Sequence, residues 1–386
     1  MSSRRVYLDY NATTPIREEV KAALIADLEV YGNASSMHEE GRSAGNRVEA
    51  ARAAVASLIG APSDTIVFTS GGSESNNTVF QTMLLRAEGK PRNEIITTAI
   101  EHPCVMNSAE FLRSRGLKVT FLPVDGNGKI HLDDLAAALS EKTLLVSVML
   151  ANNEIGTIQD IPAVSRMAKA AGAWMHTDAV QAAGKIPVNV DALGVDYLTM
   201  SCHKIYGPKG VGALYVRKGA PLEPLIRGGH QEKGLRAGTY NNVGILGFGV
   251  AAEWALRDLE TYGKQTRRLR NALRDGLLAR VGDIRVNGHP HDVLPNTLDV
   301  SFPGAEGEAI LLSLDLMGIE ASTGSACASG SLEPSHVLMA TGVGPELAHG
   351  SIRFSLGRNT TEEDVAYVLE TVPPIIARLR AMSTVH

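Results

Sequence analysis

The chain has 386 residues, of which 44% are hydrophobic and 20% charged, with a net charge of −5 and a pI near 6.1. These values are typical of a soluble globular protein of about two domains, and the acidic balance argues against nucleic acid or an anionic membrane as the main partner. Three widely spaced cysteines exclude a disulfide framework and favour a reducing cytoplasm. We expect no secretory signal and no membrane span, because no apolar run follows the N-terminal arginines and none reaches ~18 residues elsewhere.

Short apolar runs alternate with helical patterns through the first two thirds of the chain. The runs are continuous, as in strands that are covered on both faces, and the β-α rhythm predicts a mostly parallel sheet with right-handed crossovers. We therefore expect an α/β fold with a large domain over residues 16–250, in which helices flank a seven-stranded sheet. The predicted strands are Thr65–Thr69, Glu94–Thr98, Lys118–Leu122, Thr143–Leu150, Ala173–Thr177, Asp196–Ser201 and Gly212–Val216.

The rhythm changes after about residue 241. A long helix is predicted over Gly247–Val281, and a last helix follows the capping-box residues Thr360–Glu363. Between them the pattern predicts the strands Asp283–Val286, Thr297–Phe302 and Ile352–Leu356 and the helix Glu306–Met317. Residues 251–386, joined by residues 1–15, are therefore predicted to form a smaller α+β domain.

Polar residues that follow the predicted strands should meet at one edge of the sheet, where ligands of α/β proteins bind. After the first strand, Gly71, Gly72 and Ser73 open a helix, and backbone N–H groups with a helix N-terminus favour an anion such as phosphate. A Gly-Gly turn with a capping serine is also common as pure structure, so this segment alone leaves both readings open.

Two further strand ends carry chemistry. Asp178 follows one strand, where it could be only a helix cap. Lys204 follows another, and partial burial would make its amine a usable nucleophile. A phosphate loop, an aspartate and a strand-end lysine, in this order, fit pyridoxal phosphate, with Lys204 as the Schiff-base lysine and Asp178 holding the pyridine nitrogen protonated.

Three other residues fit the same site. His102 can lie over the cofactor ring and exchange protons, and Asn153 can bond the ring hydroxyl or a substrate carboxylate. Arg353 lies inside an apolar strand and needs an anion partner, for which a carboxylate suits its fork; a structural salt bridge is the alternative.

Cys327 lies in a run of small residues, Thr323–Ser331. Such residues bury little surface, so we expect a mobile, partly exposed loop with a reactive thiol at its centre, although free cysteines are more often buried. Cys104 and Cys202 are expected to be fixed by packing.

The order of these motifs resembles the cysteine desulfurase family, the NifS/IscS-like enzymes among the class-V pyridoxal-phosphate aminotransferases. The likeness covers nearly the whole chain. It rests on the segments Tyr7–Pro15, Asn33–His38, Thr69–Asn77, Glu101–His102, Asn152–Gly156, His176–Gln181, Ser201–Lys204, Arg236–Thr239, Gly324–Cys327 and Ser351–Arg358.

The resemblance implies fold type I and a role for each matching residue. Lys204, Asp178 and His102 keep the roles given above, Gln181 would bond the ring hydroxyl, and Cys327 would take the sulfur. Thr239 would reach the phosphate of a partner subunit in a homodimer. The phosphate would be held by Gly72, Ser73, Ser201 and His203, and the substrate carboxylate by Arg353, Asn153 and Asn11.

The resemblance also implies the reaction and its partners. The enzyme would convert L-cysteine to L-alanine, leaving a persulfide on Cys327, and would pass the sulfur to a NifU/IscU-type scaffold for iron–sulfur assembly. It would hold no metal of its own, although Cys327 could contact a nascent cluster on the scaffold. The short C-terminus favours the nitrogen-fixation branch. A selenocysteine lyase, another class-V aminotransferase and a scaffold without turnover are the alternatives.

Overall fold

The large sheet consists of the seven strands that the sequence predicts. The structure is a computed structural model that describes residues 4–324 and 334–382. The strand order is β2-β8-β7-β6-β5-β3-β4, and β8 alone runs antiparallel to its neighbours in this sheet. The strands are β2 (Ile66–Thr69), β3 (Glu94–Thr98), β4 (Lys118–Leu122), β5 (Thr143–Ser147), β6 (Trp174–Asp178), β7 (Tyr197–Ser201) and β8 (Gly212–Val216).

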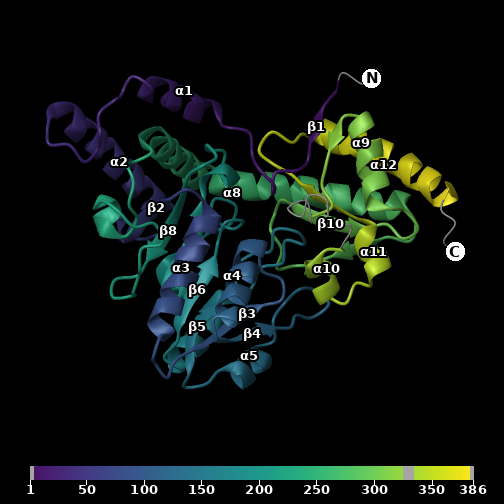
Figure 1. Ribbon diagram of the computed structural model, residues 1–386. Coiled ribbons are helices and arrows are strands. Elements are labelled where there is room, and N and C mark those ends of the chain that lie inside the picture. The colour runs from purple at the N-terminus through teal and green to yellow at the C-terminus, as the bar shows by residue number, and fades with distance from the viewer. Residues whose placement is uncertain (1–3, 325–333, 383–386) are drawn as a thin grey trace.

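Helices cover both faces of this sheet (Figure 1). Ile95 and Leu145 pack into one apolar cluster, whereas their neighbours Ile96 and Val146 pack into another. This alternation explains the continuous apolar runs in the sequence, because successive side chains of a strand point to opposite faces. The flanking helices are α1 (Glu18–Asp27), α2 (Glu39–Leu58), α3 (Gly72–Ala87), α4 (Pro103–Ser114), α5 (Leu132–Ala138), α6 (Ile161–Ala170) and α7 (Val190–Leu193).

A second core lies around a three-stranded antiparallel sheet of order β12-β10-β9. Val6 and Leu8 of the N-terminal segment belong to this core, and β1 (Val6–Tyr7) pairs in parallel with β11 (Ile319–Glu320). The other elements are β9 (Arg285–Asn287), β10 (Thr297–Ser301), β12 (Ser351–Ser355), α9 (Gly307–Leu316), α10 (His336–Ala340), α11 (Pro345–His349) and α12 (Glu362–Met382). The N-terminus therefore packs with the C-terminal third of the chain.

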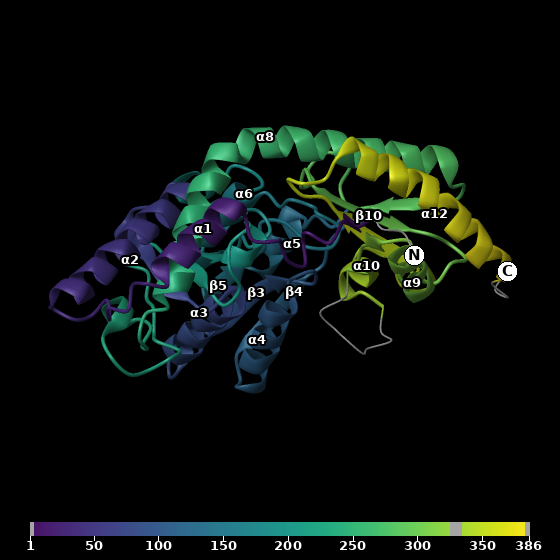
Figure 2. The ribbon, with the colours of Figure 1, turned by 90° about the horizontal axis from the view of Figure 1, so that it is seen from above.

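The helix α8 (Asn242–Arg280) connects the two cores (Figure 2). It has 39 residues, which corresponds to a length of about 58 Å. The helix begins five residues before the predicted start, because the side chain of Asn241 caps it by accepting from the Gly244 N–H at 3.1 Å. Phe248 lies in the core of the large sheet, and Leu273 lies in the second core. The predicted division at residue 250 falls inside this helix and stays a prediction.

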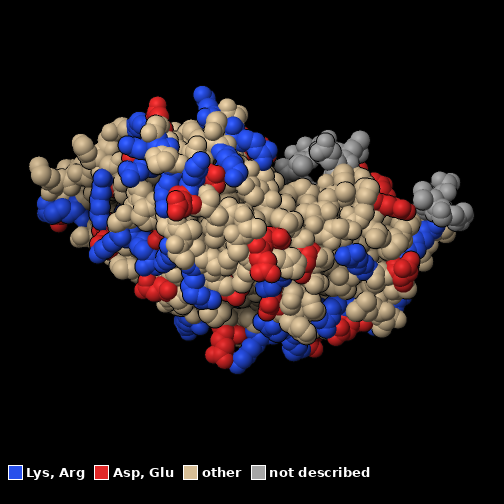
Figure 3. Space-filling view, turned by 90° about the horizontal axis from the view of Figure 1, so that it is seen from below, with Lys and Arg blue, Asp and Glu red and all other residues tan. Residues whose placement is uncertain are grey.

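Charged side chains of both signs cover the face shown in Figure 3, with Lys and Arg gathered toward the end of the molecule that carries α2. In the described part of the chain, none of the helices combines the length and the apolar character that crossing a membrane requires.

Candidate active site

One cavity gathers nearly all of the predicted site residues. It lies where the carboxyl ends of the large-sheet strands meet the N-terminal segment and β12. The predicted residues that line it are Asn11, Gly72, Ser73, His102, Asn153, Asp178, Gln181, Ser201, His203, Lys204 and Arg353. Of the other two, Thr239 is exposed and lies away from this cavity, and Cys327 lies outside the described residues.

The first turn of α3 forms one end of the cavity. Gly71 precedes the helix and provides no side-chain cap, so the first N–H groups of the helix are left for another acceptor. At Gly72 a Cβ would lie 2.9 Å from Val180 Cγ2, so a larger residue would press against the cavity wall. The hydroxyls of Ser73 and Ser201 and the imidazole of His203 are further possible donors here. Such a set of donors suits a phosphate group.

Asp178 is the last residue of β6 rather than the first residue after it, and its carboxylate is held in a fixed orientation. Oδ2 accepts from Asn76 Nδ2 at 2.7 Å, and Oδ1 accepts from the Val180 N–H at 2.9 Å. Asn76 is a site residue that the sequence motifs do not single out. It stands four residues after Gly72 on α3, and this helical spacing is the signal that places it beside the first turn.

Lys204 ends the short helix Cys202–Lys204, directly after β7. Its Nζ donates to the carbonyl oxygens of Asn11 and Ala12 at 2.5 and 2.7 Å. The amine therefore lies in the cavity, held by the N-terminal segment.

His102 caps α4, and its protonation follows from its surroundings. Nδ1 accepts from the Cys104 N–H at 3.2 Å, which places the proton of the neutral ring on Nε2. Burial, together with the charges of Lys204 and His336, lowers the pKa of His102, although Asp178 opposes this effect. The ring is therefore neutral near pH 7.

The thiol of Cys104 lies 3.0 Å from His102 Nδ1 and lines the cavity. The expectation that packing alone fixes this residue is therefore incomplete. Burial raises the pKa of Cys104 to about 12, which keeps it a thiol. Cys202, by contrast, is completely buried in the core, as expected.

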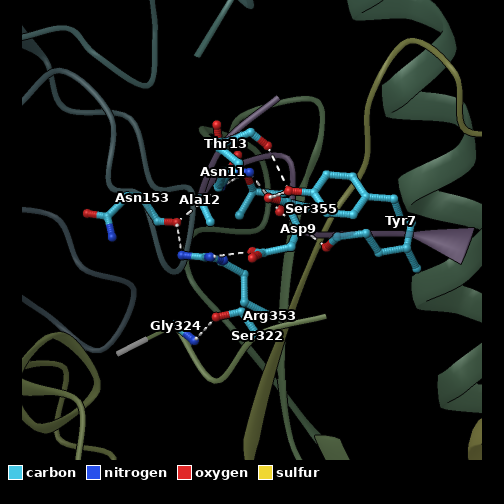
Figure 4. A network of polar contacts seen from close by, with 12 residues as sticks. Tyr7, Asp9, Asn11, Ala12, Thr13, Asn153, Ser322, Gly324, Arg353 and Ser355 are labelled. Carbon is cyan, nitrogen blue, oxygen red and sulfur yellow. Dashed lines mark hydrogen bonds and ion pairs between the residues drawn. The ribbon is translucent and has the colours of Figure 1, made fainter. Parts of the chain in front are cut away.

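Arg353 joins β12 to the N-terminal segment (Figure 4). Its Nη2 forms an ion pair with Asp9 Oδ1 at 2.7 Å, and its Nη1 donates to the carbonyl oxygen of Asn153 at 3.1 Å. The side chain is almost fully buried, and its Nε has no partner among the described residues. Arg353 thus forms the salt bridge that was the alternative reading, and it also lines the cavity. The sequence did not identify Asp9 as its partner.

Gly324 and Ser335 both lie beside Glu154. The Ser335 hydroxyl donates to Glu154 Oε2 at 2.5 Å, and a Cβ at Gly324 would lie 3.0 Å from the same oxygen. Gly324 also lines the cavity. Burial raises the pKa of Glu154. Cys327 follows Gly324 by three residues in the sequence.

The chain belongs to the class-V aminotransferase family, whose model matches residues 6–368. Its architecture is fold type I, in which a large, mostly parallel sheet is flanked by helices.

Within this family the chain groups with the cysteine desulfurases. It is 51% identical to cysteine desulfurase IscS of Dictyoglomus turgidum over 98% of this chain and 96% of that protein. A solved NifS-like protein superposes with a TM-score of 0.91 at 41% identity and covers 97% of this chain and 100% of that one. The structure of SspA in complex with cysteine has a TM-score of 0.80 at 33% identity, over 92% of this chain and 99% of that one.

Proposed function

We propose that this protein is a cysteine desulfurase that converts L-cysteine to L-alanine and leaves the sulfur on Cys327 as a persulfide. One thiol and one cysteine give one alanine and one persulfide, so the reaction needs no external oxidant or reductant. The observation that carries the proposal is that one cavity contains an amine, an oriented carboxylate and a carboxylate-binding arginine, Lys204, Asp178 and Arg353. The solved relative that holds cysteine supports the substrate.

The residues of the cavity fit pyridoxal 5'-phosphate. The uncapped first turn of α3, with Ser73, Ser201 and His203, suits the phosphate. Asp178, oriented by Asn76, would hold the proton of the pyridine nitrogen, and Lys204 Nζ would attach the cofactor. When bound, the cofactor supplies an electron sink that allows bonds next to the substrate amine to break.

The other residues act on the substrate. Arg353 and Asn153 bind its carboxylate, because a guanidinium fork matches a carboxylate, and Asn11 lies nearby in the same cavity. When it is not attached to the cofactor, Lys204 Nζ would take the proton of the substrate α-carbon, and His102, with its proton at Nε2, would be a second proton donor in the cavity. Gln181 Nε2 would donate to the ring hydroxyl of the bound cofactor. Cys327 attacks the substrate sulfur as a thiolate, and the S–S bond forms as the substrate C–S bond breaks. The electron pair of the broken bond stays with the β-carbon, which takes up a proton to become the methyl group of alanine.

The enzyme works in the cytoplasm as a homodimer in which Thr239 reaches the phosphate of the partner's site. Cys327 passes its sulfur to a NifU/IscU-type scaffold for iron–sulfur cluster assembly. Service to nitrogenase is part of this proposal, and its support is the likeness to a NifS-like structure.

Spectroscopy and mass spectrometry test the proposal. Protein purified with pyridoxal phosphate should be yellow, and L-cysteine should change the absorbance and add one sulfur to Cys327. Lys204→Ala should lose the visible band, whereas Lys209→Ala, at an exposed lysine five residues later, should keep it.

Cys327→Ala should keep the visible band but form no persulfide. Release of sulfide from cysteine by Cys327→Ala at the wild-type rate would contradict the proposed role of this thiol and favour a different lyase.

A further inference from the structure

Lys185 is a buried lysine beside the cavity to which the proposed reaction gives no role. Its side chain is 3% exposed. Its Nζ donates to Gln181 Oε1 at 2.6 Å and to Asn11 Oδ1 at 3.0 Å. Both acceptors are neutral amide oxygens rather than carboxylates, and both residues line the cavity. A buried amine placed between two cavity residues is a candidate for controlling how their side chains point.

The contacts of Gln181 determine where the oxygen and the nitrogen of its side-chain amide lie. The Lys185 amine donates to this amide, so the atom of Gln181 that faces Lys185 is the oxygen. The other end, Nε2, donates to the carbonyl oxygen of Asn11 at 2.9 Å. A flipped amide would place its oxygen against that carbonyl, where neither atom can donate. Since an amide nitrogen carries two N–H groups, the second N–H remains for an acceptor in the cavity.

Asn11 is fixed in the same way. Its Oδ1 accepts from Lys185 and from Asn296 Nδ2 at 3.0 Å. Its Nδ2 donates to Thr297 Oγ1 at 2.8 Å and to the carbonyl oxygen of Asn153 at 3.1 Å. Lys185 therefore ties the Gln181 amide to the segment that holds Lys204.

The two charges that act on Lys185 are cationic. Burial, and then the charges of Lys204 and Arg353, hold the pKa of Lys185 well below its usual range. The titratable groups that line the cavity are Lys204, Arg353, Asp178, His102, His203 and Cys104. In either protonation state the amine keeps an N–H for Gln181 Oε1, so Lys185 and the Asn11 carbonyl together orient the amide.

We infer that Lys185 is a positioning residue that holds the Gln181 amide with an N–H directed at the ring hydroxyl of the bound cofactor. This inference rests on the proposed function, because it assumes pyridoxal phosphate in the cavity. A hydrogen bond donated to an oxygen favours its deprotonated form. Lys185 thereby lowers the pH at which the bound cofactor titrates.

The test follows the visible absorption band of the loaded protein as a function of pH. Lys185→Met, which keeps the length of the side chain and removes the donor, should raise the midpoint of this titration by about one pH unit, as expected for the loss of one hydrogen bond to a charged group. Lys185→Leu serves the same purpose if Lys185→Met does not fold. Lys264→Met, at an exposed lysine of α8, is the matched control and should titrate like the wild type.

A double-mutant cycle separates positioning from general support of the fold. Gln181→Met should raise the midpoint by itself, and adding Lys185→Met to it should change the midpoint little further. An unchanged midpoint in both Lys185 variants, or an equal additional shift in the Gln181→Met background, would overturn the inference. A wild-type protein that shows no visible band with pyridoxal phosphate would instead overturn the proposed function.

Discussion

At the scale of single residues, the charge that balances Arg353 belongs to Asp9. The two side chains come from positions 344 residues apart and meet at 2.7 Å. The hydroxyl of Tyr7 donates to the Asp9 carbonyl at 3.0 Å and so supports the segment that carries the carboxylate. A substrate carboxylate would therefore meet a guanidinium that is already oriented, and little side-chain entropy would be lost on binding.

Arg353→Lys should weaken binding of cysteine while preserving the charge. A lysine cannot hold Asp9 and a carboxylate in the fork geometry, and a lost hydrogen bond to a charged group corresponds to an increase in KM of about 10- to 100-fold. Steady-state kinetics with L-cysteine measure this change. Arg378→Lys, at an exposed arginine of α12, is the control. If Arg353→Lys had the KM of the wild type, Arg353 would not bind the substrate.

Glu101 gives the protein a stability that depends on pH. Burial raises the pKa of this carboxyl to about 8 from 4.5, and its Oε2 has no partner among the described residues. Between pH 4.5 and about 8, the folded state thus keeps a proton that the unfolded state has lost. The contribution of Glu101 to the free energy of unfolding is therefore fully present below pH 4.5 and is lost as the pH rises toward 8.

Glu101→Gln should therefore raise the melting temperature more at pH 8 than at pH 5. The new amide retains Oε1 for the Thr98 hydroxyl and the Met149 N–H, which are at 2.8 and 2.9 Å. Thermal unfolding at the two pH values measures the difference, with Glu110→Gln on the surface of α4 as the control. An equal change at both values would show that Glu101 is ionised in the fold.

At the scale of elements, close contact between α8 and α2 depends on a glycine. A Cβ at Gly249 would lie 2.7 Å from Ala51 Cα, a backbone atom that cannot move aside alone. Gly263, in the same helix, has its nearest contact at 3.9 Å. The two glycines therefore differ in packing and share the same helical backbone.

Alanine at these positions should change the stability in opposite directions. Gly263→Ala should stabilise by up to about 1 kcal/mol because alanine favours helix. Gly249→Ala should destabilise, since overpacking costs about 1–3 kcal/mol and exceeds that gain. The two melting temperatures, compared with the wild type, measure both effects. Stabilisation by both substitutions would show that the helices separate at little cost.

The strands of the large sheet could be predicted because each is a local apolar run. The end of the cavity that suits a phosphate could be predicted because Gly72 and Ser73 closely follow one of these strands. The end of β5 was predicted at Leu150, but the strand ends at Ser147, even though the Leu150 N–H still bonds the Asp178 carbonyl at 2.9 Å. Asp9 and Lys185 could not be assigned from the sequence. Their partners come from distant segments, and a local pattern contains no information about such contacts.

At the scale of the whole molecule, the cavity belongs to both cores. Asp178 ends a strand of the large sheet, and Gly72 and Lys204 lie in helices that follow two other strands of it. Arg353 comes from the smaller sheet and Asn11 from the N-terminal segment. A ligand that contacts both sets links the two cores, and it stabilises the folded state by an amount that grows with the logarithm of its concentration relative to its dissociation constant.

Addition of pyridoxal phosphate should therefore slow amide hydrogen exchange in residues 8–14 and 351–357 as well as in the first turn of α3. The outer end of α4, residues 110–116, should exchange at the same rate with and without the cofactor. Mass spectrometry of peptides from these segments measures the rates. Slowing confined to the large sheet would show that the cofactor does not contact the N-terminal segment.

The continuous helix α8 has a consequence for how the chain can be divided. A cut at the predicted boundary would leave each fragment with only part of a helix whose apolar side chains fill both interiors. Neither fragment would then have a complete interior, and each would expose a surface that fits the other. The predicted domain boundary thus lies in a helix that both cores share. We therefore expect two fragments cut there to complement each other when they are combined, and neither fragment to fold when it is expressed alone.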